Sequence, residues 1–239
     1  MISKMIHKYD SPHKELHRSY RAPWLRAAVL GVNDGIVSTS GLMLGVYGAS
    51  ANHPAILTAG IAGLVAGAIS MGVGEYVSVS SQKDSEKADI EIEKRSIASN
   101  PDEELAELAW IYEQRGVDKD LAMQVAMQLH EYDAVGAHAR DELDINQDAL
   151  ANPTQAALAS MVAFSIGALV PIIAALLSIS ANGAFLIVIF SIVGLGISGS
   201  IGAYIGGGRK LYAAMRVLVG GALGMAITYG IGLLIGHTL

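Results

Sequence analysis

AGIAGLVAGAISMGVGEYVSVSSQKDSEKADIEIEKR, residues 59–95, is the stretch that decides the fold. Up to Ser80 its residues are small or apolar, with Glu75 as the one charge, whereas charged residues dominate from Gln82 onward. No proline separates the two halves. Because proline is the residue that most strongly interrupts a helix, the stretch predicts one continuous helix whose first half lies in lipid and whose second half lies in water.

The composition of the whole chain agrees with a membrane location. Of 239 residues, 52% are hydrophobic and 16% are charged, whereas soluble domains carry about 25% charged residues. The chain contains no cysteine, which excludes disulfides and thiolate metal sites. A bound metal would therefore use carboxylate, histidine, methionine or backbone ligands.

The acidic residues are concentrated in one part of the chain. Between Lys83 and Asp148 lie 18 of the 22 acidic residues and only seven Lys and Arg, a net charge of −11. This concentration predicts a water-soluble insert inside a membrane protein. Such a charge in a small domain is costly through self-repulsion, so we expect cations to neutralise it.

The apolar segments predict an all-α membrane protein with five transmembrane helices and a cytoplasmic three-helix acidic insert between helices two and three. About 20 apolar residues cross a bilayer, and residues 25–49 and 55–79 meet that length. Residues 149–208 carry no charge and suffice for two crossings with a break at 178–183, and 217–235 make the fifth. The predicted domains are a basic lead-in (1–24), two membrane helices (25–81), the metal-binding insert (82–150) and three membrane helices (151–239).

Positive residues predict the orientation, because Lys and Arg near span ends prefer the cytoplasm. Five of them precede the first span, and Arg209, Lys210 and Arg216 separate the last two spans, while the two other short loops have none. We therefore expect the N-terminus and the insert to be cytoplasmic and the C-terminus to be outside. A bacterial plasma membrane is the expected location.

The insert also shows helix boundaries. Asn100 followed by Pro101 suits the start of a helix that runs to about Gln114. Asp118 can cap a further helix that runs to about Ala137. We expect the buried side of this last helix to consist of its larger apolar residues, Leu121, Val125, Met127 and Leu129.

Asp34, in the first span, is the sharpest functional signal. An ionised carboxylate near the centre of a span costs about 2.5–3.5 kcal/mol on insertion scales, so it normally faces a partner or a wet cavity. The alternative is that Asp34 lies near the cytoplasmic end and is solvated. Met71 alone would be a packing residue, but beside a buried carboxylate its thioether suits a borderline ion such as Fe²⁺. Together with Glu75, one helical turn after Met71, these residues form the predicted transport pathway.

Carboxylates of the insert form the second candidate site. Glu86, Asp89 and Glu93 follow one helical stripe, and Glu104 and Glu107 are three residues apart on the next helix. Two such helices packed together would bring several oxygens to a divalent cation. The competing interpretation is a solvated acidic face, which charge runs often form.

The sequence disfavours an enzyme. A di-iron oxidase would need Glu-x-x-His pairs on facing helices, and neither His130 nor His138 has a Glu three positions before it. There is also no nucleophile–base pair, phosphate loop or cofactor motif, and no basic, aromatic surface pattern for nucleic acid. We therefore expect no enzyme activity, no prosthetic group and no nucleic-acid partner.

Two motifs resemble a known family. GVNDGIVSTSGLMLGV at 31–46 and LTAGIAGLVAGAISMGVGEYVSVSSQKD at 57–84, followed by an acidic insert and three more spans, resemble the vacuolar iron transporter family, in a bacterial-type member. The resemblance implies a homodimeric five-span carrier that exchanges cytoplasmic Fe²⁺, sometimes Mn²⁺, for protons. It also implies a cytoplasmic three-helix metal-binding domain.

The resemblance also implies roles for individual residues. Asp34 and Met71 match the family's membrane metal residues. In the insert the matching metal ligands are Glu93, Glu104, Glu107 and, across looser spacing, Glu142.

The chain departs from the family pattern at three positions. Gly63 stands where eukaryotic members often have Glu, which bears on proton coupling and ion preference. Ser96 replaces an expected Glu and His138 stands where Met is common, which indicates a rearranged insert site that includes His138.

The sequence thus predicts a divalent metal/proton antiporter that exports Fe²⁺ from the cytoplasm, with Mn²⁺ and Zn²⁺ as further ions and with the insert capturing metal. Its expected partners are the metal ions, protons, membrane lipid and a second copy of the chain. The alternative is a membrane-anchored metal-binding or sensing protein without transport.

Overall fold

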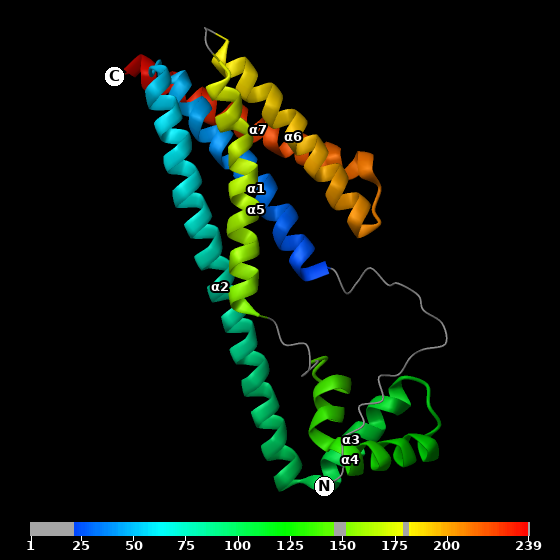
Figure 1. Cartoon of the computed structure of the whole chain (residues 1–239). Coiled ribbons are helices and arrows are strands. Elements are labelled where there is room, and N and C mark those ends of the chain that lie inside the picture. Colours follow the sequence, from blue (N-terminus) through cyan, green and yellow to red (C-terminus); the bar gives the residue numbers. More distant parts are fainter. Residues whose placement is uncertain (1–21, 146–151, 179–181, 239) are drawn as a thin grey trace, which may run out of the picture. The chain divides into compact units, whose positions relative to one another are not determined.

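The protein is described by a computed structural model over residues 22–145, 152–178 and 182–238, and within these residues it contains helices and no strands. Figure 1 labels the helices. They are α1 (Ala22–Gly48), α2 (His53–Ser99), α3 (Pro101–Gln114), α4 (Lys119–Asp141), α5 (Pro153–Leu176), α6 (Gly183–Gly206) and α7 (Lys210–Thr238). The predicted all-α fold is confirmed.

Five of these helices, α1, α2, α5, α6 and α7, are long and apolar enough to cross a membrane. The predicted number of spans is therefore confirmed. The N-terminal Lys and Arg residues used for the orientation lie outside the described residues.

Helix α2 is one continuous helix of 47 residues, as the absence of proline predicted. The chain divides into two compact units, one containing the described residues up to Met71 and from Ala159 onward, the other spanning Gly72–Leu158. We call them the membrane unit and the insert unit. Helix α2 contributes to both.

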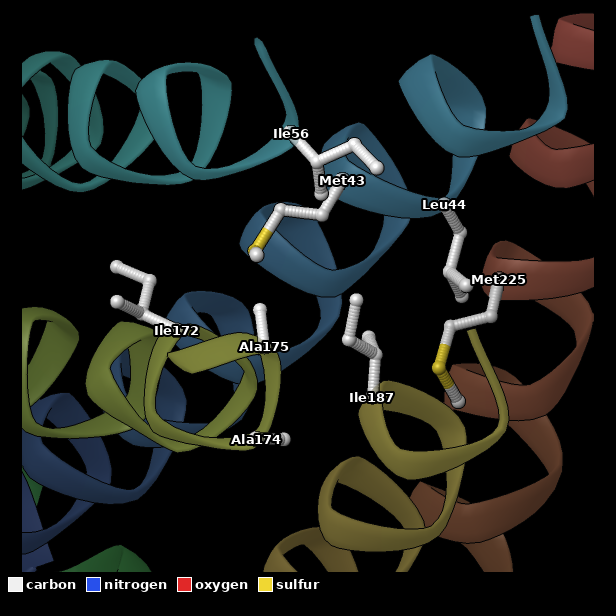
Figure 2. Close-up of a cluster of buried hydrophobic side chains, with 8 residues drawn as sticks. All are labelled: Met43, Leu44, Ile56, Ile172, Ala174, Ala175, Ile187 and Met225. Atoms are coloured by element: carbon white, nitrogen blue, oxygen red, sulfur yellow. The ribbon is translucent and has the colours of Figure 1, made fainter. Parts of the chain in front are cut away.

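The membrane unit has a core of buried apolar side chains contributed by all five of its helices (Figure 2). They are Met43, Leu44, Ile56, Ile172, Ala174, Ala175, Ile187 and Met225. Glycine allows the helices to approach closely, because a Cβ at Gly35 of α1 would collide with the Phe164 carbonyl of α5. Close approach through small residues is how membrane helices gain packing contacts.

The start of α7 differs from the prediction. The segment 209–216 was expected to be a loop before a fifth span at 217–235, but α7 already begins at Lys210. Helix α6 ends at Gly206, and Gly207 has a φ of 79°, so the turn is completed within three residues. The positive charges of the segment therefore lie on or beside the first turns of a helix.

The insert unit is built around the contact between α3 and α4. Its core contains Leu108 and Ala109 of α3 with Ala126 and Ala137 of α4. The Asp118 carboxylate caps α4 by accepting a hydrogen bond from the Asp120 amide at 3.0 Å, as predicted.

Two local expectations for the insert were wrong. Helix α3 runs from Pro101 to Gln114 as predicted, but the Asn100 side chain, expected to cap it, makes no cap hydrogen bond with the described residues. On α4, Leu121 and Met127 are 52% and 47% exposed, whereas Ala122 and Ala126 are fully buried. Alanines at this interface let the backbones of α3 and α4 approach closely, which larger side chains would prevent.

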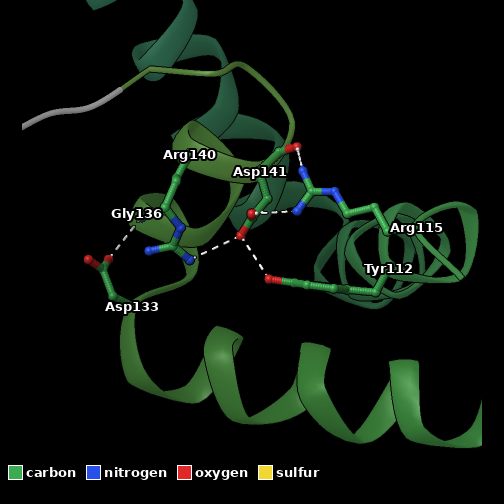
Figure 3. A network of polar contacts seen from close by, with 6 residues as sticks. All are labelled: Tyr112, Arg115, Asp133, Gly136, Arg140 and Asp141. Atoms are coloured by element: carbon green, nitrogen blue, oxygen red, sulfur yellow. Dashed lines mark hydrogen bonds and ion pairs between the residues drawn. The ribbon is translucent and has the colours of Figure 1, made fainter. Parts of the chain in front are cut away.

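Helix α4 is kinked at Asp133, whose φ and ψ of −164° and 84° are not helical. The Gly136 amide donates a hydrogen bond of 3.0 Å to the Asp133 carboxylate and starts the helix again after the kink (Figure 3). Helix α4 then continues to Asp141, beyond the predicted end near Ala137.

Asp141 anchors this last part of α4 to α3 (Figure 3). Its carboxylate accepts hydrogen bonds from the Tyr112 hydroxyl at 2.9 Å, from Arg115 at 2.8 Å and from Arg140 at 3.0 Å. The residues that follow the kink are thereby held against α3.

Candidate metal centre

Four side chains from three helices converge in the insert unit. They are Glu93 of α2, Glu104 of α3, His138 of α4 and Glu142 at the end of α4, and their candidate ligand atoms all lie within 4.8 Å of one another. His138 is fully buried, and Glu93 and Glu104 are only 6% and 7% exposed. Acidic groups at this depth require a partner, because burying an uncompensated charge is costly.

The His138 ring lies among the carboxylates. Its Nδ1 is 3.0 Å from Glu93 Oε1, 3.0 Å from Glu142 Oε2 and 3.7 Å from Glu104 Oε2. A single ring N–H can donate to only one of them well, and Ser96 donates its hydroxyl to Glu104. The carboxylate oxygens therefore outnumber these donors, which is the arrangement that a divalent cation can complete.

The electrostatics of the cluster raise the pKa of Glu93 and of the neighbouring Glu107. Burial, and next the nearby Glu142, raise the pKa of Glu93 to about 7, although His138 acts to lower it. Burial followed by the charges of Glu142 and Glu104 also raises the pKa of Glu107. Since metal ligands must lose their protons, a cation here competes with protons near neutral pH.

The structure does not bring every predicted insert residue into this cluster. Glu107 is exposed one turn further along α3, near enough for its pKa to respond to the cluster. Asp89 is exposed, and Glu86 accepts a hydrogen bond from Gln82 at 2.8 Å instead. Sequence reasoning did not predict the neighbour of His138, which is His130, whose ring packs edge-on to that of His138.

In the membrane unit, Asp34 and Met71 line the same pocket of about 230 Å³. The pocket is also lined by three hydroxyl residues, two glycines and two large apolar residues, which are Ser38, Thr39, Ser70, Gly63, Gly67, Leu42 and Phe164. The pocket therefore combines a carboxylate, a thioether and several hydroxyls, which are ligand types that d-block cations accept. Glu75 is half-buried and belongs to the insert unit, so its place in a pathway stays a prediction.

The chain has five helices long and apolar enough to cross a membrane, which makes it a multi-pass membrane protein. Its pocket offers a carboxylate and a thioether, and its insert unit offers a cluster of buried carboxylates. These groups are suited to binding cations. Comparison with known proteins narrows this class. The model of the VIT family matches residues 25–233, and the chain belongs to this family.

Individual relatives support the same family assignment. The chain is 42% identical over 237 residues to a vacuolar iron transporter of Acanthamoeba castellanii, covering 98% of this chain and 88% of that protein. It is 36% identical over 219 residues to vacuolar iron transporter homolog 2 of Arabidopsis thaliana, covering 91% and 87%. A VIT-like transporter 1b of Glycine max is 35% identical over 225 residues, covering 94% and 81%. The family is one of transporters, so the prediction that the chain is not an enzyme is confirmed.

Proposed function

We propose that the protein carries Fe²⁺ out of the cytoplasm in exchange for protons. The observation that carries the proposal is the shared pocket of Asp34 and Met71 in the membrane unit. The names of the relatives, which are vacuolar iron transporters or their homologs, support iron as the substrate. Mn²⁺ is a second substrate of the same charge with a stronger preference for oxygen ligands.

In this proposal Asp34 binds the ion and exchanges it for a proton. A carboxylate oxygen cannot hold a metal and a proton in the same position, so arrival of one favours departure of the other. The Met71 thioether is a soft ligand that favours Fe²⁺ over harder ions. Gly63 adds no further carboxylate to the pocket wall, which leaves Asp34 as the acid of the pocket.

The insert unit captures metal before transport. Glu93, Glu104 and Glu142 supply carboxylate oxygens from three helices, and Glu107 stands on the next turn of α3 to attract the ion. A divalent cation replaces the protons held there and relieves the repulsion among the acids. The insert and the N-terminus lie in the cytoplasm, and two copies of the chain assemble in the membrane.

The test is Fe²⁺ flux in proteoliposomes with the proton gradient present, absent and reversed. An antiporter moves Fe²⁺ in the direction opposite to the protons. The lumen should therefore become more alkaline when Fe²⁺ enters and more acidic when Fe²⁺ leaves. Flux that is indifferent to the gradient would contradict proton exchange. Native mass spectrometry of the same preparation should give two chains per particle.

One observation favours a second function, which is metal binding or sensing without transport. The whole carboxylate cluster lies within the insert unit, so it needs nothing from the membrane unit to bind an ion. Under this alternative the purified protein binds Fe²⁺ but releases none across the membrane under any gradient. The flux assay therefore separates the two functions.

A further inference from the structure

The kink in α4 brings together two histidines that a regular helix would separate. His130 and His138 are eight positions apart, which corresponds to about 12 Å along a straight helix. Because the helix turns at Asp133, their ring centroids are only 6.3 Å apart, with the rings inclined at 78°. A Cβ at Gly136 would meet the Asp133 carboxylate, which would have to turn aside to make room for it.

Each of the two rings presents a buried nitrogen without a partner. Among the described residues, neither His138 Nε2 nor His130 Nδ1 has a hydrogen-bond partner, and both atoms are buried. They also make no hydrogen bond to each other. Leaving a buried polar group unsatisfied costs about 1–3 kcal/mol, and two such groups on neighbouring rings are available to bind a further atom.

The other nitrogen of His138 decides what Nε2 can do. Nδ1 is hydrogen-bonded to Glu142 Oε2 at 3.0 Å, and we assign the proton of the neutral ring to Nδ1, because a carboxylate oxygen can only accept. In the neutral ring Nε2 then carries a free lone pair that can bind a cation. A histidine that binds metal typically donates its second ring N–H to a carboxylate, which fixes the tautomer and the orientation of the ring.

We infer that His138 Nε2 and His130 Nδ1 form a second cation site of the insert, which adjoins the carboxylate cluster and shares His138 with it. Imidazole suits borderline divalent ions such as Fe²⁺, Co²⁺, Ni²⁺ and Zn²⁺, whereas Mn²⁺ prefers oxygen ligands. Water completes the coordination. Glu142 acts on this site through its hydrogen bond to His138, and the site exists whether or not the chain transports Fe²⁺.

The test compares two probe ions on the full-length protein in detergent. Co²⁺ reports nitrogen ligands through its visible absorption bands, and Mn²⁺ reports oxygen sites by electron paramagnetic resonance. The variants are His130→Phe, which removes both nitrogens, and His130→Gln, which keeps a polar group. His53→Gln is the matched control, because the His53 ring is already hydrogen-bonded to the Ala175 carbonyl at 3.0 Å.

Both His130 variants should weaken Co²⁺ binding by roughly 10- to 100-fold and change its absorption bands, while Mn²⁺ binding stays as in the wild type. The control should change neither. Co²⁺ titrations and spectra that coincide with those of the wild type would mean that only water lies between the rings. Equal weakening of Co²⁺ and Mn²⁺ would mean that His130 acts on the carboxylate cluster, and it would also overturn the second site. If His130→Phe lowers the melting temperature, the Co²⁺ affinity and spectrum of His130→Gln decide whether the second site exists.

Discussion

Glu93 is the residue at which burial and charge conflict most strongly. Its pKa, raised to about 7 from an ordinary 4.5, means that the folded protein resists ionisation of this acid more than the unfolded chain does. The resulting cost is absent below pH 4.5, grows as the pH rises, and is fully present above pH 7. Without metal, the insert should therefore lose stability between pH 4.5 and 7.

Asp141 changes the folding stability with pH in the opposite direction to Glu93. Burial acts to raise its pKa, but hydrogen bonds from Arg115, Arg140 and Tyr112 outweigh that effect and lower it. Its contribution to stability is present above pH 3.8 and is lost as the pH falls through its lower folded value. Thermal unfolding of the metal-free protein should thus show greatest stability at mildly acidic pH. Glu93→Gln should flatten the decline toward pH 7, and an unchanged decline would show that another group causes it.

Glu104 and Glu107 test which oxygens bind the ion. Glu104 is buried within the cluster, whereas Glu107 is exposed one turn away. Glu104→Gln should reduce Mn²⁺ affinity by roughly 10- to 100-fold, the range seen when groups that support a metal site are lost, and Glu107→Gln should reduce it less. Isothermal titration of the two variants measures both values. If Glu107→Gln had the larger effect, the site would lie further out on α3.

At the scale of helices, the approach of α1 to α5 is one of the tightest backbone contacts among the described residues. Gly35→Ala would place a methyl group against the Phe164 carbonyl, which is backbone and cannot turn aside. Overpacking of this kind costs about 1–3 kcal/mol or more. Gly220→Ala in α7 is the matched control, because a Cβ there meets nothing within 4 Å. Melting temperatures in detergent should fall for Gly35→Ala alone, and equal values would show that α1 and α5 separate at little cost.

The helices also show what the sequence could predict. The continuity of α2 was predictable because no proline interrupts a stretch that changes from apolar to charged. The buried face of α4 was not, because hydrophobicity ranks Leu121 and Met127 above the alanines. Ala122 and Ala126 are buried instead, and Ala126 packs in the core shared with α3, a requirement that appears only when both helices are in place.

At the scale of the whole molecule, the two candidate sites differed in how far the sequence could define them. The pocket residue Asp34 was predictable as a carboxylate inside a span, and Met71 as a thioether that could join it in a metal site, which the resemblance also implied. In the cluster, Glu93, Glu104 and Glu142 were predictable from charge and resemblance, and His138 from its departure from the family pattern. The pairing of His130 with His138 was not, because it depends on a single non-helical residue at Asp133.

The central claim is that Asp34 carries the ion and the proton through the membrane unit. Asp34→Asn keeps the size of the side chain and removes its charge, and a neutral residue is easier to insert into a bilayer. The protein should therefore still fold. Because the carboxylate cluster lies within the insert unit, its affinity for Mn²⁺ should not change.

The measurement is Fe²⁺ flux into proteoliposomes under an imposed pH gradient, paired with Mn²⁺ affinity in the same preparations. The account predicts gradient-driven flux for the wild type, flux no greater than in protein-free liposomes for Asp34→Asn, and equal Mn²⁺ affinity for both. Normal flux through Asp34→Asn would contradict the account and would make Asp34 a carboxylate without a role in transport.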